Sequence, residues 1–393
     1  MSTSNFYFLV TLLAFASKIT LGRKLRPDNN NFIDNTEIAK QLQYAVRVDT
    51  QHQDDPTSTH CSSPSAQWLR GQIEDVSEED LSNFFDWQLH ILPFLYKLYV
   101  APRKYEQEYF GLNGEYTDEI IQIHHKAQEF WSDSGVNDEI YLLSAHGNDL
   151  ADINNLVPTL ELLFYASYNE NYTIYDHASD IQQLISRLPG QCSFPLLTFN
   201  AFATDEMKDQ DSSIIIGDGY FQFQNELGMD GEGPEFSHTH EFSHHLQFLL
   251  GISSGIKSGV TKVAKERELM ADAFSAYFLA HDEGAALSAH EISNVHEVAF
   301  SVGDCRISHE GHHGTPFQRR CATLWAASLA DNSEEGIRMG LLELKRRFDG
   351  WYETVDGLDD SCHLPSAATP RAYYRTVSFR GVMILVGLYN MLL

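Results

Sequence analysis

The chain has 393 residues, of which 43% are apolar and 21% are charged, so it can bury one or two sizeable cores and is not disordered throughout. Its 55 Asp and Glu residues outnumber its 27 Lys and Arg residues, which gives a formal net charge of −28. Such a field repels phosphate backbones and anionic lipid headgroups, and it argues against a nucleic-acid-binding protein or a polybasic membrane-binding protein. A pI near 4.9 suits a soluble extracellular protein.

Residues 1–16 are predicted to be a cleaved secretory signal. An uncharged apolar run from Phe6 to Ala16 is too short to span a bilayer, and Ala14-Phe15-Ala16 supplies a small-x-small cleavage pattern. The alternative is a buried N-terminal helix. Secretion implies an oxidising compartment in which disulfides can form. An odd number of cysteines leaves at least one thiol unpaired, and the sequence does not decide which cysteines pair. The five cysteines are Cys61, Cys192, Cys305, Cys321 and Cys362.

Residues 17–77 are rich in Asn, Gln, Asp, Ser and Thr, a composition that buries little surface and predicts a linker or a pro-segment. Near its start, Arg23-Lys24-Leu25-Arg26 resembles the RxLR translocation motif of plant-pathogen effectors; a basic processing site is the alternative.

Residues 78–190 show apolar spacings of one, three and four residues, which predict a helical subdomain. Asn171-Tyr172-Thr173 in this block is a predicted glycosylation sequon. The clearest helical stretches after the first one at residue 78 are 118–131, 157–168 and 176–188.

The pattern changes after residue 190. Residues 196–203 and 213–223 read as strands, and a glycine-rich loop follows them. A helix is then predicted from Pro234 to Leu250, because proline suits a first turn and Gly251 is a good C-terminal stop.

This predicted helix carries the pattern His-Glu-x-x-His. His240 and His244 lie one turn apart on the same face, so both imidazoles can bind one tetrahedral Zn²⁺. Glu241 is offset by one residue and is predicted to act on a water molecule as general base. The alternative is a His-rich tract that binds metal without specificity, in which His238 and His245 are equal partners.

A second helical run, residues 266–281, offers the third ligand that a catalytic zinc site needs. Glu268 is the candidate, and Asp272, one turn further on, can accept the second N–H of a ligand imidazole. Small alanines on this run permit close helix packing. Glu266, His281 and His290 remain rival ligands.

These two runs resemble the bacterial neutral zinc metallopeptidases, whose pattern is HExxHHxQ followed by ELxAD. Val302-Gly303-Asp304 and His313-Gly314-Thr315-Pro316-Phe317-Gln318-Arg319-Arg320 look like that family's GDD and HGTxxQR blocks. Upstream, Asn200-Ala201-Phe202-Ala203 and the strand after it look like a segment of the CAAX-prenyl-protease-like gluzincins that lies along the substrate. The resemblance implies a zincin fold with His240, His244 and Glu268 as ligands and Glu241 as base. Ser243 stands where the family usually has Gly, and Cys305 replaces the second acid after Asp304.

Peptide hydrolysis also needs a group that stabilises the oxyanion. His312 and His313 are the candidates, with Asp304 as an orienting acid; the alternative is that each is an ordinary loop histidine. A weaker hypothesis concerns latency: an unpaired Cys61 in the polar segment could occupy the fourth zinc position until that segment is cut away.

The C-terminal tail has the order of a GPI-attachment signal. Small residues at Ser366-Ala367-Ala368 precede a spacer at 369–380 and an apolar end at 381–393. A last helix or strand docked in the core is the alternative.

Together the patterns predict an α+β chain with a zincin-like catalytic domain, built from a small sheet, the HExxH helix and a Glu-bearing helix behind a helical N-terminal block. The expected organisation is signal peptide 1–16, polar segment 17–77, helical subdomain 78–190, catalytic domain 191–348 and tail 349–393. The expected function is a secreted zinc metalloendopeptidase that acts on protein or peptide substrates. The alternative is a catalytically silent zinc-binding module of the same fold. The sequence leaves the oligomeric state open.

Overall fold

The computed structural model describes residues 61, 63–102, 108–136, 140–164, 172–205, 211–252, 261–305, 312–331, 337–358 and 360–363. The predicted signal peptide, the RxLR-like motif, the sequon at Asn171 and the GPI-like tail lie outside these residues. Within the described part of the chain, no helix has both the length and the apolar character that a membrane crossing requires.

The sheet has three strands, β1 (Tyr141–Ala145), β2 (Ala201–Thr204) and β3 (Ser213–Gly217), in the order β1-β3-β2. β1 runs parallel to β3, and β2 runs antiparallel to it. Every residue of β3 is buried, as expected for the central strand. β2 therefore forms one edge of the sheet among the described residues.

The second predicted strand run, 213–223, is only half a strand. It ends at Gly217, and α9 (Asp218–Glu226) follows at once. The chain turns here because its backbone packs tightly against Thr198: a Cβ on Gly217 would lie 2.1 Å from the Thr198 carbonyl oxygen. Phe221 and Phe223, which the pattern placed on the strand, are buried on this helix instead.

The other sheet predictions also need correction. The run 196–203 forms a strand only from Ala201, because Pro195–Leu197 is a 3₁₀ turn. β1 was not predicted at all: it lies inside the block 78–190 that the periodicity marked as helical. That block thus contributes a strand to the same sheet as β2 and β3.

The rest of the described chain is mostly helical, in keeping with the expected α+β class. Besides α9, the helices are α3 (Pro64–Ile73), α4 (Glu78–Asp86), α5 (Leu92–Leu95), α6 (Thr117–Trp131), α7 (Ile153–Phe164), α8 (Ile174–Arg187), α10 (Glu232–Leu249), α11 (Thr261–Ala280), α12 (Ala289–Ser301), α13 (Pro316–Asp331) and α14 (Leu341–Tyr352). Reciprocal capping boxes start α8, with Thr173 and Asp176, and α12, with Ser288 and Glu291.

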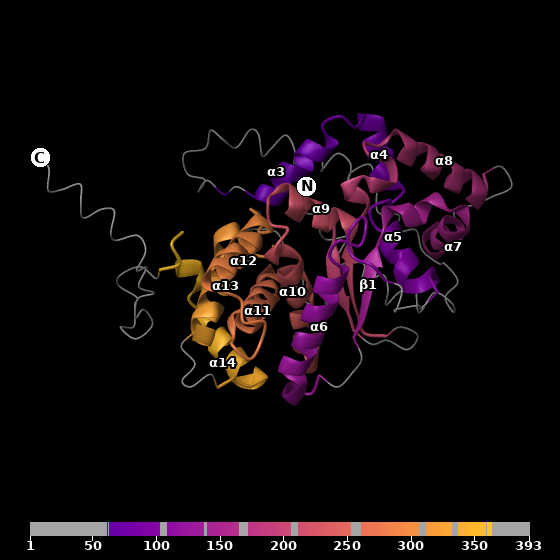
Figure 1. The fold of residues 1–393 in the computed structure, drawn as a ribbon. Coiled ribbons are helices and arrows are strands. Elements are labelled where there is room, and N and C mark those ends of the chain that lie inside the picture. Colours follow the sequence, from indigo (N-terminus) through magenta and orange to yellow (C-terminus); the bar gives the residue numbers. More distant parts are fainter. Residues whose placement is uncertain are drawn as a thin grey trace, which may run out of the picture.

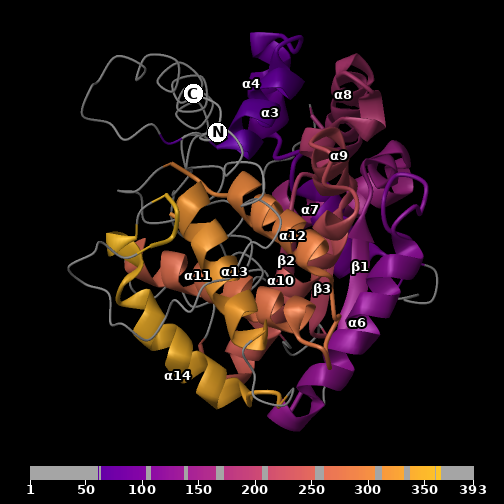
Figure 2. The same cartoon turned by 60° about the vertical axis from the view of Figure 1, so that its left-hand side comes forward.

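Helix α10 is central to the molecule. Figure 1 shows it between α6 and the sheet on one side and α11 to α13 on the other, with α14 outermost. The larger hydrophobic core surrounds α10 and α11, and a second core lies beneath α3, α4 and α8. In the turned view of Figure 2, α3 and α4 stand at the top of the molecule, above α12 and α9.

Part of the polar segment 17–77 is folded. Its residues 64–73 form α3, which starts with Ser63 as N-cap and Pro64 in the first turn. Trp68 is buried, and its indole N–H donates a 2.7 Å hydrogen bond to Glu226 on α9. The composition of the whole segment concealed this apolar anchor.

The cysteine pairing contradicts the latency hypothesis. Cys61 forms a disulfide with Cys305, so it is not a free thiol that could bind zinc. Cys321 pairs with Cys362, and Cys192 is the free cysteine of the described chain. Two disulfides fit an extracellular protein. The first one ties the start of α3 to the residue that follows Asp304.

Candidate metal centre and pocket

Helix α10 is polar in sequence yet almost entirely buried. Acidic residues in its first turn suit its N-terminus, and Gly251, with φ of 73°, follows its end as the left-handed stop residue. Burial is tolerated because most of its polar groups have partners: Ser243 donates to the Thr239 carbonyl at 2.8 Å, and the Thr239 hydroxyl lies 2.5 Å from that of Ser275 on α11.

His240, His244 and Glu268 come together between α10 and α11, with one ligand atom from each within 4.8 Å of the others. His240 Nε2 lies 3.3 Å from Glu268 Oε2, and His244 Nε2 lies 3.7 Å from Glu268 Oε1. Two imidazole nitrogens and one carboxylate converging at these distances can hold a metal ion. Among the described residues, no other set of three His, Cys, Asp or Glu side chains brings its ligand atoms this close together.

The other nitrogen of His240 is held by a hydrogen bond to a carboxylate. Its Nδ1 lies 2.8 Å from Asp272 Oδ1, so Nδ1 carries the proton and Nε2 is left for a ligand role. Arg319 on α13 donates two 2.7 Å hydrogen bonds to the Asp272 carboxylate. Burial acts to raise the pKa of Asp272, but the guanidinium outweighs it and keeps that pKa below its usual value. Asp272 therefore contacts a ligand imidazole, as predicted. Its second partner, Arg319, was not predicted.

His244 is oriented in a parallel way by an amide. Its Nδ1 lies 3.1 Å from Gln247 Oε1, one turn further along α10. The amide nitrogen of Gln247 donates in turn to the Arg267 carbonyl on α11, at 2.7 Å. Gln247 thus links the two helices while it directs Nε2 of His244 toward Glu268.

The remaining histidines of α10 point elsewhere. His238 Nε2 lies 3.0 Å from His124 Nδ1 on α6, and His245 Nε2 lies 3.2 Å from the Ser213 carbonyl on β3. The rival ligands Glu266, His281 and His290 do not belong to the group either, which among the described residues holds only His240, His244 and Glu268. His281 packs against Phe130, and His290 is exposed at the start of α12. The geometry therefore contradicts the alternative in which His238 and His245 bind metal as equal partners of His240 and His244.

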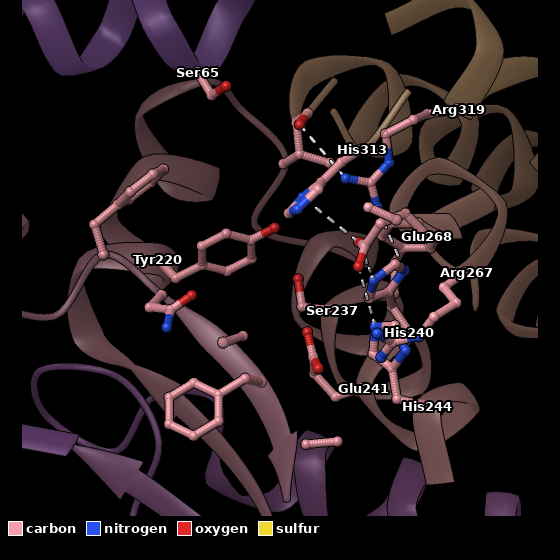
Figure 3. Close-up of a pocket in the computed structure, with 18 of the residues that line it drawn as sticks. Ser65, Tyr220, Ser237, His240, Glu241, His244, Arg267, Glu268, His313 and Arg319 are labelled. Carbon is pink, nitrogen blue, oxygen red and sulfur yellow. Dashed lines mark hydrogen bonds and ion pairs between the residues drawn. The ribbon is translucent and has the colours of Figure 1, made fainter. Parts of the chain in front are cut away.

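The metal group forms one wall of a pocket of about 1120 Å³, solvent at its mouth included. Edge strand β2, Phe236 and Tyr220 line it as well, and Ser65 on α3 reaches its rim (Figure 3). Glu241 lies in this pocket beside the ligands. Burial raises the pKa of Glu241 to about 7, although its neighbour His240 and the Ala203 backbone N–H oppose the shift.

Tyr220 faces the metal group across the pocket in Figure 3. Burial raises the pKa of its hydroxyl, so at neutral pH the hydroxyl is protonated and can donate a hydrogen bond. Tyr220 was not among the predicted site residues, because its sequence pattern is typical of a strand. Gly217, where β3 ends, was the available sign of a turn.

The two histidines proposed for oxyanion stabilisation differ in position. His313 lines the pocket, with Nδ1 3.8 Å from Glu268 Oε2. His312 does not line it; its Nδ1 lies 2.6 Å from Asp304 Oδ1. The other carboxylate oxygen of Asp304 accepts the His313 backbone N–H at 2.7 Å, so Asp304 fixes the loop that presents the His313 ring.

Two of the missed residues had a signal in the sequence. Gln247 is the Gln of the HExxHHxQ pattern and Arg319 stands in the HGTxxQR-like block, but the spacing alone did not say what either one contacts. Comparison with protein-family models, with curated proteins and with solved structures found no match to this chain. The candidate centre is therefore defined by its own geometry.

Proposed function

We propose that this chain is a secreted zinc-dependent metallopeptidase. The observation that carries the proposal is the convergence of His240, His244 and Glu268 in a pocket that also holds Glu241. Three protein ligands with an open side are typical of catalytic zinc sites, whereas structural sites use four.

The donor set fits zinc. Two neutral imidazoles and one carboxylate suit this ion, and both ligand imidazoles have their second nitrogen bound to an acceptor, as metal-binding histidines usually do. When bound, the ion would supply the Lewis acidity that activates water near neutral pH and polarises a peptide carbonyl.

The chain's own residues account for the proton transfers. Glu241, a buried carboxylate that lines the pocket beside the ligands, takes a proton from the attacking water. The hydroxyl oxygen adds to the carbonyl carbon, and Glu241 then gives the proton to the leaving amide nitrogen as the C–N bond breaks. Tyr220 and His313 line the pocket and can donate hydrogen bonds to the developing oxyanion.

A peptide substrate has a place to lie. β2 is an edge strand that lines the pocket, and the Ala203 backbone N–H already faces the Glu241 carboxylate. An extended peptide can add to such an edge through main-chain hydrogen bonds, which places its carbonyls beside the metal group.

The competing function is a zinc-binding module without turnover. Glu241 separates the two, because a pure binding site has no use for a buried carboxylate beside the ligands. The test is a peptide-hydrolysis assay on purified chain with and without a chelator, together with Glu241→Gln. We expect the chelator to abolish hydrolysis, zinc to restore it, and Glu241→Gln to lower kcat by about 10² to 10⁴ while zinc stays bound. Full activity of Glu241→Gln would refute the mechanism, and no hydrolysis by zinc-loaded wild type would favour the binding module.

A further inference from the structure

The pocket contains two arginines, and they differ in their partners. Arg319 is committed to Asp272 through two hydrogen bonds. Arg267 also lines the pocket, but its guanidinium makes no hydrogen bond or ion pair with any of the described residues, and its Nε is buried without an acceptor. In a chain with 55 acidic and 27 basic residues, an arginine in a pocket without a carboxylate partner is unexpected.

Arg267 is fixed in place close to the metal group. It precedes the ligand Glu268 on α11, and its carbonyl is held by the Gln247 amide that also orients His244. Figure 3 shows Arg267 on the His244 side of the site, across from Tyr220.

Arg267 and Arg319 are the arginines that line the pocket, together with apolar residues such as Phe248 and Ala264. Because Arg319 is committed to Asp272, the Arg267 guanidinium is the one that can pair with a ligand. A partly buried N–H donor without an acceptor is costly to leave unpaired, and the planar guanidinium fork matches a carboxylate in a bidentate pair. The neighbouring carboxylates of Glu241 and Glu268 are assigned to the base and ligand roles.

We propose that Arg267 forms a subsite that binds a carboxylate of the peptide substrate. The inference rests on the proposed function and deepens it, because it names a substrate class: peptides that carry a negative charge close to the scissile bond. That charge is either the side chain of Asp or Glu or the free C-terminal carboxylate. The first source makes the enzyme an endopeptidase selective for acidic residues, and the second makes it a carboxypeptidase.

The experiment uses four matched peptides: Glu or Gln at the tested position, each with a free or an amidated C-terminus. Equilibrium binding is measured on the zinc-loaded chain carrying Glu241→Gln, which does not consume the peptide, and kcat/KM is measured on the active chain. We expect a carboxylate to tighten binding by about tenfold or more. The preference identifies its source: Glu over Gln for a side chain, acid over amide for the terminus.

The same measurements on Arg267→Gln should abolish the preference while binding of the neutral peptide stays the same, and Arg267→Lys should retain part of it. Lys265→Gln is the matched control, because Lys265 is a cation on the same helix that pairs with Asp356. Zinc content is determined for every variant, since Arg267 adjoins a ligand.

The subsite is overturned if the Glu241→Gln chain with Arg267 intact binds all four peptides equally well, or if the preference survives when Arg267→Gln is added. A carboxylate preference in binding without any hydrolysis by the active chain would instead overturn the proposed peptidase function and leave the subsite standing.

Discussion

Helix α10 carries four buried histidines, and the two that face α11 differ from the other two in what their rings contact. His240 and His244 each have one nitrogen held by a partner and turn the other toward Glu268. His238 and His245 contact α6 and β3 instead. Histidines on one face of α10 therefore belong to the metal group, and histidines on the other face serve packing.

The partners, rather than burial, make this difference. Asp272 and Gln247 fix the tautomers on the metal face. On the other face, His124 and His238 share a hydrogen bond in a setting where burial lowers the pKa of both. The first arrangement prepares a nitrogen for a cation, and the second works only while the rings stay neutral.

Removing the cation behind Asp272 should have the largest effect on stability. Arg319→Met leaves the fully buried Asp272 carboxylate without its cation and with only the His240 ring as a partner, so we expect a loss of about 3–5 kcal/mol in the free energy of unfolding and weaker zinc binding. Arg320→Met is the control, because its pair with the exposed Glu297 is worth about 1 kcal/mol or less. Urea unfolding measures both, and equal losses would contradict the account.

Acid should act on the opposite face through His124. Burial lowers its pKa from 6.5 to about 4 in the folded chain, so the unfolded chain binds more protons as pH falls through this interval and stability drops. The contribution is up to about 3 kcal/mol, fully present above pH 6.5 and lost toward pH 4. Unfolding at several pH values should show a shallower decline for His124→Leu.

His125 provides the comparison for that measurement, because it is the exposed neighbour of His124 on α6. His125→Gln should keep most of the wild-type pH dependence, because burial, more than the charge of His125, lowers the pKa of His124. An identical slope for wild type and His124→Leu would show that the buried pair is not the acid-sensitive element.

The smallest effect is expected for Gln247→Met. The variant keeps the ligands but frees the orientation of His244, so zinc affinity should fall by about 10- to 100-fold. Ser243→Ala is the matched control, because its hydroxyl bonds only to the Thr239 carbonyl within α10. Competition with a zinc-binding dye measures both constants; unchanged affinity in Gln247→Met would remove its orienting role.

Part of this site could be read from spacing. The one-turn separation of His240 and His244 places both on one helix face, and Asp272 follows Glu268 by one turn, so a local rule related the members of each pair. The choice of Glu268 over its rivals also drew on the resemblance to the ELxAD pattern. The same rule could not decide the fate of His238 and His245, because their roles depend on α6 and β3, which meet α10 only in the folded chain.

Other features needed tertiary contacts from the start. β1 has five residues within a helical block, and what makes it a strand is its pairing with β3. The folding of α3 rests on two buried side chains, Trp68 and Leu69, in a polar stretch. The pairing of Cys61 with Cys305 joins positions 244 residues apart, a choice that no spacing rule makes.

The most direct test of the central claim is the zinc content per folded chain in wild type, Glu268→Ala and His245→Asn, measured by elemental analysis after dialysis. The account predicts about one zinc ion per chain in wild type and in His245→Asn, whose amide can still donate to the Ser213 carbonyl, and close to none in Glu268→Ala. Stoichiometric zinc in Glu268→Ala, or loss of zinc from a folded His245→Asn, would contradict the assignment of the two faces of α10.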